Sequence, residues 1–463
     1  MPATGGHTGS VRNAFRMQGR DAADRPEERR QWRDLNEARE SSRKSVVQSG
    51  EIKALSGLRI FAALWVVLFH FRELIGQVAP GFRSALAPLL NCGAQGVDLF
   101  FILSGFVLAW NYLDRMGETW STRATLRFLW LRLARVWPVY LVTMHLAAAW
   151  IIFTLHVGHV PAENASELNA VSYLRQLALV QLWFQPFFDG TSWDGPAWSI
   201  SAEWLAYLLF GVLALVIFRI ARVTRVRTLM WMAFAASLPP ILLLLATGLF
   251  YTPWSWLPRI VFQFTAGALA CAAVRKLRLS ERSRRNTGLL SVVIVAAMIG
   301  GIFWLFFNPI ATILDSSGLV DILFVPLVVT LAVGIGSLPG LLSARLLVYC
   351  GHISFSLYMV HELVHVAWNW TAAQFDVVLT PTWTGKAIVA GLVFLALGGA
   401  VALYHLVEEP ARKWMRRMLD VGPAVTEANS SASEASHDSN RLRLRSLGQA
   451  QQAHTEAPSA RAG

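Results

Sequence analysis

Apolar residues occur in long runs along most of the chain, and short polar connections separate these runs. Ten of them are long enough to cross about 30 Å of hydrocarbon as a helix that rises about 1.5 Å per residue. Their approximate limits are 55–75, 95–113, 132–157, 196–219, 228–250, 255–275, 287–307, 319–338, 353–373 and 385–408. The pattern predicts an all-α fold, a polytopic membrane bundle of about ten transmembrane helices.

Polar segments flank the apolar runs at both ends. Residues 1–50 contain ten Lys/Arg and seven Asp/Glu, and residues 419–463 are rich in Ser, Ala, Arg and Gln. Neither segment can bury enough apolar area to offset the entropy lost on ordering. The sequence therefore predicts a disordered N-terminal tail over 1–50, a membrane domain over 51–418 and a disordered C-terminal tail over 419–463.

The placement of charge predicts the orientation. The net charge is +12, and 15% of residues are charged, against about 25% in soluble domains. The cations gather in the connections after the even-numbered runs, at Arg115, Arg123 and Arg127, then Arg219, Arg222, Arg225 and Arg227, then Arg275, Lys276 and Arg278, and at Arg412, Lys413, Arg416 and Arg417. By the positive-inside rule both termini are cytoplasmic. We expect a multi-pass protein of the plasma (inner) membrane that contacts lipid and binds no nucleic acid.

The first apolar run contains two ionisable residues, Arg59 and His70. Eleven helical residues turn about 1,100°, so both lie on one face, about 16 Å apart along the axis. With the N-terminus inside, the arginine suits a phosphorylated donor and the deeper imidazole suits proton transfer. The alternative is that Arg59 snorkels to the interface and His70 makes a structural hydrogen bond.

Asp98 is near the outer end of the second run, which places it close to the level of His70. A buried carboxylate beside an imidazole would orient its tautomer and stabilise the imidazolium. We therefore expect Asp98 to orient His70, unless it only caps its own helix.

Two arginines, Arg132 and Arg135, stand one turn apart at the expected inner start of the third run, with Trp137 beside them. Such a pair can clamp phosphates, and the indole offers a flat neighbour for a base. Any positive-inside boundary has a similar composition, so this pattern alone does not decide function.

The fourth run begins with Pro196, followed by Trp198, Ser199 and Glu203. Ser199 and Glu203 share a helix face because they are four residues apart. Glu203 can bind a sugar hydroxyl, take part in proton transfer, or pair with an arginine elsewhere.

The ninth run contains His361, Glu362 and His365 in the spacing of zinc proteases. A zinc site needs a third protein ligand, and no neighbouring run offers a convincing one. We therefore expect no metal and two hydrogen-bonding histidines. The three cysteines, Cys92, Cys271 and Cys350, have no metal-ligand spacing and are interpreted as structural thiols.

Taken in order, these segments resemble the acyltransferase-3 family of integral membrane acyltransferases over about residues 51–418. The matching segments are Leu55-Ser-Gly-Leu-Arg59 followed by His70, Gly96-Val-Asp-Leu-Phe-Phe-Ile-Leu-Ser-Gly105, Arg132-Leu-Ala-Arg135-Val-Trp-Pro, Pro196-Ala-Trp-Ser-Ile-Ser-Ala-Glu203, Ile353-Ser-Phe-Ser-Leu-Tyr-Met-Val-His361 and Glu408-Glu-Pro410. Each segment is weak alone, whereas six in the family's order on ten spans are specific. Ala202 and Trp204 differ from the residues that commonly flank the glutamate at position 203 in this family, and His365 is not part of the family motif.

The resemblance implies transfer of an acyl group, expected to be acetyl, from cytoplasmic acyl-CoA to a hydroxyl of a cell-envelope glycan or a small acceptor. It implies donor binding by Arg59, Arg132 and Arg135. The expected catalytic residues are His70, Asp98 and Glu203, with His70 as general base or as the group that carries the acyl. Trp198, Ser199, Tyr358 and His361 are expected to bind the acceptor. The oligomeric state is not defined.

Two other classes of function share these residues. An intramembrane zinc protease would use His361, Glu362 and His365. A non-enzymatic transporter would use the intramembrane charges for substrate or proton movement, but it has no particular use for the paired arginines.

Overall fold

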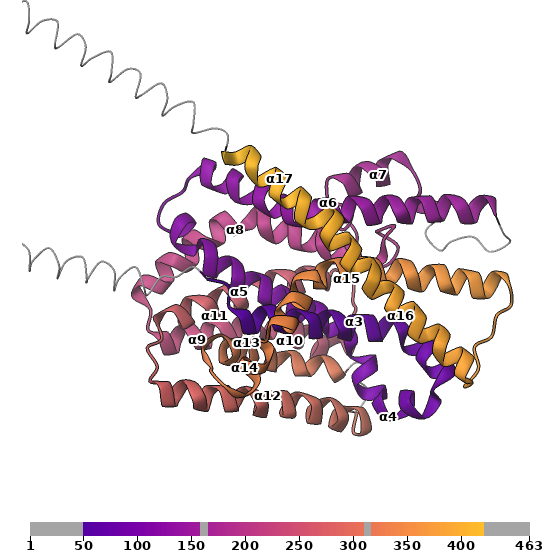
Figure 1. Cartoon of the computed structure of the whole chain (residues 1–463). Coiled ribbons are helices and arrows are strands. Elements are labelled where there is room, and N and C mark those ends of the chain that lie inside the picture. Colours follow the sequence, from indigo (N-terminus) through magenta and orange to yellow (C-terminus); the bar gives the residue numbers. More distant parts are fainter. Residues whose placement is uncertain (1–49, 158–164, 310–315, 421–463) are drawn as a thin grey trace, which may run out of the picture. The chain divides into compact units, whose positions relative to one another are not determined.

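The computed structural model describes residues 50–157, 165–309 and 316–420, and every regular element in these ranges is helical. The predicted tails lie almost wholly outside them. The helices are α3 (Lys53–Val78), α4 (Pro80–Asn91), α5 (Gly96–Gly117), α6 (Thr122–His156), α7 (Ala170–Leu177), α8 (Trp198–Val223), α9 (Val226–Ala236), α10 (Leu238–Thr247), α11 (Trp256–Lys276), α12 (Glu281–Phe307), α13 (Phe324–Val333), α14 (Ser337–Leu342), α15 (Arg345–Gln374), α16 (Trp383–Leu403) and α17 (Glu409–Asp420). Figure 1 shows the long helices lying side by side. The predicted all-α fold is confirmed.

Eight helical segments in the described ranges are long and apolar enough to cross a membrane. Each of the ten predicted runs coincides with a helix or a pair of helices. The run 319–338 corresponds to the shorter apolar segment Gly318–Val333 and is outside the eight, as is α15. The run 228–250 is divided into α9 and α10 at Ser237, just before Pro239 and Pro240. The protein is thus a multi-pass helical membrane protein, while ten crossings and cytoplasmic termini remain predictions.

Helix α6 begins ten residues earlier than its apolar run. The hydroxyl of Ser121 accepts a hydrogen bond from the backbone N–H of Ala124 at 3.2 Å and caps the new start. Arg132 and Arg135 are therefore well inside a 35-residue helix, with Arg132 about 15 Å from its first residue. They stand at the start of the predicted apolar run but not at the start of the helix.

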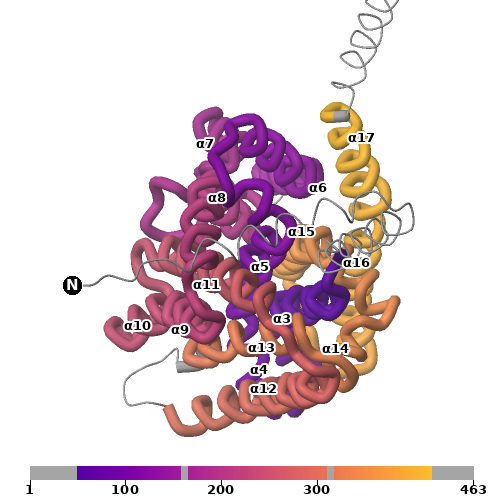
Figure 2. The backbone as a smooth tube through the Cα atoms, turned by 90° about the vertical axis from the view of Figure 1, so that its left-hand side faces the viewer, coloured from indigo at the N-terminus to yellow at the C-terminus, as the bar shows by residue number. Residues whose placement is uncertain are grey.

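Helices α5 and α11 approach each other closely through two glycines. A Cβ on Gly105 would lie 1.9 Å from the carbonyl oxygen of Phe264, and one on Gly267 would lie 2.0 Å from that of Ile102. Only glycine allows this separation. Two ion pairs, Asp98 with Arg259 and Asp114 with Arg275, follow the same direction along both helices, so α5 and α11 are parallel. Figure 2 views the helices nearly end-on and shows α5 and α3 enclosed by the others.

Helix α7, between α6 and α8, is amphipathic with its apolar face outward and a polar residue buried. Its exposed residues include Val171 (58% exposed) and Leu174 (64%), whereas Gln176 is fully buried. The backbone oxygen of Gln176 accepts a hydrogen bond from the Tyr140 hydroxyl. The side-chain oxygen of Gln176 accepts one from the backbone N–H of Trp193. The apolar face is suited to the lipid interface. The helix ends at Leu177, and turns follow.

Candidate active site

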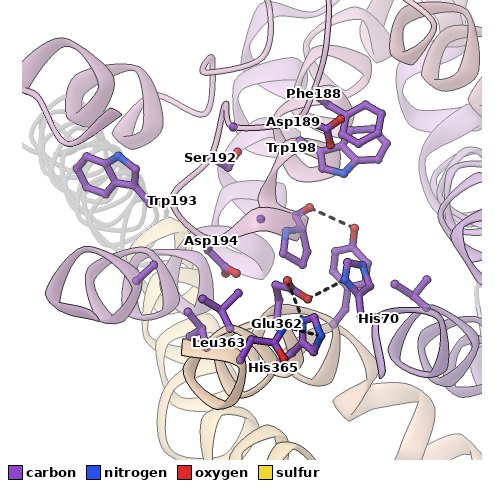
Figure 3. A pocket seen from close by; sticks show the side chains of 18 of the residues that line it. His70, Phe188, Asp189, Ser192, Trp193, Asp194, Trp198, Glu362, Leu363 and His365 are labelled. Carbon is purple, nitrogen blue, oxygen red and sulfur yellow. Dashed lines mark hydrogen bonds and ion pairs between the residues drawn. The ribbon is translucent and has the colours of Figure 1, made fainter. Parts of the chain in front are cut away.

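Helices α3 and α15 pack side by side and bring His70 to Glu362. The distance from His70 Nδ1 to Glu362 Oε2 is 2.7 Å, and the two side chains are 29% and 14% exposed. Glu362 Oε1 lies 3.2 Å from His365 Nδ1, so one carboxylate lies between two imidazoles (Figure 3). With Nδ1–H donating to the carboxylate, Nε2 of His70 is left as the basic nitrogen. This arrangement can accept a proton and stabilise the resulting imidazolium.

Behind this pair lies His361, one residue before Glu362 on α15. Its side chain is fully buried, and its ring centroid is 5.1 Å from that of His70. The Nδ1 atom is 3.3 Å from the backbone oxygen of Leu357, while Nε2 has no hydrogen-bond partner within the described ranges. His361 therefore supports the His70 ring by packing, one layer behind the cavity.

A small hydrogen-bond network of two hydroxyl groups and one backbone carbonyl oxygen joins the start of α8 to α15. The carbonyl oxygen of Pro196 accepts hydrogen bonds from Ser199 Oγ at 2.9 Å and from the Tyr358 hydroxyl at 3.1 Å. The two hydroxyl oxygens are 2.8 Å apart. All three residues are buried. Ser199 thus holds the 3₁₀ turn Gly195–Ala197 in place beside Glu362.

His70, Glu362 and His365 line a cavity of about 750 Å³, the usual size for a small-molecule site. Eight aromatic side chains also line it: Phe69, Trp150, Phe188, Trp193, Trp198, Tyr251, Tyr358 and Trp370. The lining contains Asp189 and Asp194 from the connection before α8, and neither Lys nor Arg among the described residues. Asp194 is 1% exposed, and its burial, with the nearby Glu362 carboxylate, raises the pKa of Asp194 to about 8. Glu362 is therefore the main buried negative charge of the cavity.

Of the predicted acceptor residues, Trp198 and Tyr358 line this cavity. Ser199 and His361 lie directly behind them, as described above. Glu203 is absent from the lining and lies beside Tyr207, whose hydroxyl is close to Arg132 and Arg135. Glu203, which is one of the expected catalytic residues, therefore lies outside the lining of this cavity.

Asp98 does not pair with His70, and that prediction is wrong. Its two carboxylate oxygens accept hydrogen bonds from Nε and Nη2 of Arg259 on α11, at 3.0 and 2.7 Å. Both side chains are almost completely buried. The close approach of α5 and α11 makes this pair possible, since Asp98 is seven residues before Gly105 and Arg259 eight before Gly267. The carboxylate that contacts His70 is instead that of Glu362.

Of the predicted donor residues, Arg135 pairs with a buried glutamate, and Arg59 and Arg132 lie near Arg135. Glu408, in the π-helical turn Tyr404–Glu408, forms an ion pair with Arg135 and accepts a 2.8 Å hydrogen bond from Ser356. Arg132 donates to the Tyr112 hydroxyl at 3.2 Å. Arg59 and Arg132 are close enough to Arg135 to repel its charge, and so is Arg412 of α17. The structure therefore brings Arg59, Arg132 and Arg135 together, with Arg412 as a fourth cation.

Trp137 is occupied elsewhere. Its indole N–H donates to the backbone oxygen of Leu177, at the end of α7, at 3.2 Å. This contact turns the ring toward α7, so the predicted role as a neighbour of a donor base finds no support in the geometry.

Sequence reasoning missed three of these residues. Arg259 is an arginine within the apolar run 255–275 and should have been paired with an intramembrane carboxylate on that ground alone. Glu362 was visible only as part of a zinc pattern. Arg412 was interpreted only as one of the cations that orient the protein. It is far from Arg135 in the sequence, so no spacing indicated that the two lie close together.

An all-helical membrane domain with a histidine–carboxylate pair at a deep cavity defines a membrane-embedded enzyme of the group-transfer or hydrolytic type. Comparison with known proteins specifies the group: the family profile described as "Acyltransferase domain" matches residues 52–405. The chain therefore belongs to the acyltransferase-3 family, and it is an acyltransferase.

Two curated relatives support this assignment. The chain is 27% identical to "Acyltransferase MdmB" of Streptomyces mycarofaciens over 399 residues, which is 82% of this chain and 97% of that protein. It is 32% identical to "Protein 2 in picA locus" of Rhizobium radiobacter over 151 residues, 32% of this chain and 72% of that protein. No solved structure matches the chain significantly.

Proposed function

We propose that the protein transfers an acyl group, expected to be acetyl, from cytoplasmic acyl-CoA to a hydroxyl of a cell-envelope glycan or another exported acceptor. The observation that carries this proposal is the 2.7 Å contact between His70 and Glu362 at the wall of a large cavity. A base with a free Nε2, held by a carboxylate, is what activation of a hydroxyl requires.

The donor side of the proposal rests on charge. Arg135 pairs with Glu408, and Arg59, Arg132 and Arg412 are close enough to Arg135 to repel its charge. Guanidinium groups bind phosphate oxygens in bidentate geometry, and coenzyme A carries a pyrophosphate and a 3′-phosphate. Arg59 and His70 lie about 16 Å apart on one face of α3, which is of the order of an extended pantetheine arm. The thioester of a donor held by the arginines would thus reach toward His70.

In the proposed step, Nε2 of His70 takes the proton of the acceptor hydroxyl as its oxygen attacks the thioester carbonyl carbon. A C–O bond forms, the C–S bond breaks, and the thiolate of coenzyme A leaves with the proton returned by the imidazolium. Glu362 stabilises the imidazolium between these events. The competing route transfers the acyl group first to His70 and then to the hydroxyl, and it predicts a burst of thiol without acceptor.

The acceptor side rests on the aromatic lining. Flat indole and phenyl faces pack against apolar faces of sugar rings, while the polar groups beside them can bind hydroxyls. Trp193 and Asp194 come from the connection that the positive-inside rule places outside the cell. This supports an acceptor that enters from the side opposite the donor.

The experiment that tests the function is the release of thiol from labelled acetyl-CoA by the purified full-length protein. Lipid-linked sugars, envelope glycans and small hydroxylated compounds are supplied in turn as acceptors. We expect release that depends on acceptor and label that moves to its hydroxyl oxygen. Substrate flux in vesicles without any consumption of acetyl-CoA would instead identify a transporter.

One observation favours a second candidate, a zinc-dependent enzyme. Ligand atoms of His70, His361 and Glu362 lie within 4.8 Å of one another, a set in which His70 of α3 takes the place of His365 in the sequence pattern. We nevertheless expect acyl transfer to survive treatment with a chelator and purified protein to contain far less than one zinc per chain, because His70 Nδ1 is already bound to Glu362. Metal analysis of the wild-type protein and of His361→Ala measures this. Stoichiometric zinc that is lost in the variant would establish the metalloenzyme.

A further inference from the structure

The carboxylate that contacts His70 belongs to a longer series of polar contacts along α15. Glu362 Oε2 lies 2.7 Å from His70 Nδ1, and Glu362 Oε1 lies 3.2 Å from His365 Nδ1. On the far side of His365, the distance from its Nε2 to Nδ2 of Asn369 is 3.1 Å. Positions 362, 365 and 369 share one face of the helix. The dashed lines in Figure 3 show the carboxylate joined to both imidazole rings.

The chemistry of the groups sets the direction of donation along this series. A carboxylate only accepts hydrogen bonds, so both rings present Nδ1–H to Glu362. Nε2 of neutral His365 then carries a lone pair, which accepts from the amide N–H of Asn369. No residue that the structure describes makes a hydrogen bond to Nε2 of His70. Of the two imidazoles on this carboxylate, His70 therefore keeps its lone pair for a substrate, while that of His365 is occupied.

Packing and partial burial keep His365 in this arrangement. Its ring centroid lies 5.4 Å from that of Phe71, which is fully buried. The side chains of His365 and Glu362 are 16% and 14% exposed, so water competes only weakly for their contact. A glutamate side chain has three rotatable bonds, and a second hydrogen bond at Oε1 restricts the rotamers in which Oε2 faces His70.

The other polar groups beside Glu362 do not duplicate this contact. His361 directs Nδ1 to the backbone oxygen of Leu357 at 3.3 Å. Asp194, from the connection before α8, is near enough to act electrostatically on Glu362, but neither of its carboxyl oxygens has a hydrogen-bond partner among the described residues. Within the described part of the chain, His365 is thus the second side-chain donor to Glu362, after His70.

We propose that His365 is a positioning residue, which holds the Glu362 carboxylate toward His70, and that Asn369 prevents His365 itself from acting as the base. The inference rests on the proposed function. It concerns a residue that is not part of the family motif, so membership of the family does not assign it. His365 keeps its Nδ1 proton throughout, and no covalent step is added to the transfer.

His365→Leu is expected to lower kcat by about tenfold to hundredfold, because it removes a hydrogen bond to a charged group. The Michaelis constant for acyl-CoA should stay at the wild-type value. His365→Asn offers an amide N–H near the position of Nδ1 and should restore most of kcat. Thr371→Val is the matched control, because this half-buried hydroxyl on the same helix bonds to the backbone oxygen of Ala367 at 2.7 Å and is absent from the cavity lining. It should keep wild-type kcat.

A double change separates positioning from a general effect on the fold. In the Glu362→Gln protein the carboxylate is already lost, so the further change His365→Leu should lower kcat by no more than about twofold. A His365→Leu protein with wild-type kcat would overturn the assignment. The same fold loss from His365→Leu in both backgrounds would also overturn it, since His365 would then act independently of Glu362.

Chemical modification of the histidines gives a second readout that does not require acyl transfer. Diethyl pyrocarbonate reacts with the unprotonated nitrogen of an imidazole, and mass spectrometry of the full-length protein in detergent measures the rate at each histidine. We expect His70 to react faster than His365, and Asn369→Leu to raise the rate at His365 by freeing Nε2. This pattern in a protein that transfers no acyl group would support the series of contacts and contradict the proposed function. Equal rates at the two histidines, unchanged in Asn369→Leu, would contradict the assignment of His365 in a protein that does transfer the acyl group.

Discussion

His70→Ala is expected to lower kcat for acyl transfer by about 10²- to 10⁴-fold, the usual contribution of a positioned general base. The Michaelis constant for acyl-CoA should change little, because the arginine cluster and not the imidazole binds the donor in this account. Glu362→Gln should also reduce kcat, by about 10²-fold or more, since the amide no longer stabilises the imidazolium or fixes the Nδ1–H tautomer. Both effects are measured as steady-state thiol release with acceptor present.

His145→Ala is the matched control. This histidine is exposed on α6 and its Nδ1 bonds only to the backbone oxygen one turn earlier, with Tyr173 near its other nitrogen. The control should keep wild-type kcat. A His70→Ala protein that is folded, membrane-inserted and fully active would remove the imidazole from the mechanism. A kcat for Glu362→Gln equal to wild type would remove the carboxylate as its partner.

Asp98→Ala is expected to destabilise the membrane domain by about 3–5 kcal/mol, because it removes the bidentate partner of the buried Arg259 guanidinium, which then has only the nearby Asp321. The guanidinium lies 4.6 Å from the ring centroid of Phe250 and 5.3 Å from those of Trp198 and Tyr251, so it has no route to water. Arg259→Met should be similarly costly alone. The double change Asp98→Leu with Arg259→Met should cost much less than the sum, since neither member of the pair is left buried without the other.

The free energy of unfolding in SDS-containing mixed micelles measures these effects. Asp114→Ala is the control, because Asp114 pairs with Arg275 but is 55% exposed, and exposed pairs contribute about 1 kcal/mol or less. A loss for Asp98→Ala no larger than for Asp114→Ala would show that the buried pair does not stabilise the α5–α11 contact. Additive single and double changes would show that the two side chains do not act as a pair.

The comparison of Asp98 and Glu362 shows what the sequence could predict. Apolar run length defined the helices, and the 3.6-residue period predicted that Arg59 and His70 share one face of the helix that is now α3, because both are local properties. Which carboxylate meets His70 depends on which helices are neighbours. Its expected depth in the membrane made Asp98 a suitable partner for His70. The close glycine contact between α5 and α11 instead brings Asp98 within hydrogen-bond distance of Arg259. Glu362 lies on α15, nearly 300 residues from His70, and no periodicity connects them.

The arginine cluster illustrates the same limit. The spacing of Arg132 and Arg135 predicted a shared face, but not that α6 begins ten residues before Arg132, at a cap outside the apolar run. In the sequence, Glu408 belongs to a motif after the last apolar run that shows nothing of its partner. Its pairing with Arg135 requires the packing of α17 on α6. Local patterns gave the residue types of the donor site, while the tertiary packing determined which charges are paired.

The central claim is that an acyl group passes through the membrane domain, from an inner cationic site to His70 at an outer cavity. Proteoliposomes of one orientation test it most directly, with labelled acetyl-CoA confined to the side of the basic connections and the acceptor confined to the other. We predict that label crosses to the acceptor, that thiol stays on the donor side, and that His70→Ala abolishes the transfer. Transfer only when donor and acceptor share one compartment would contradict the account.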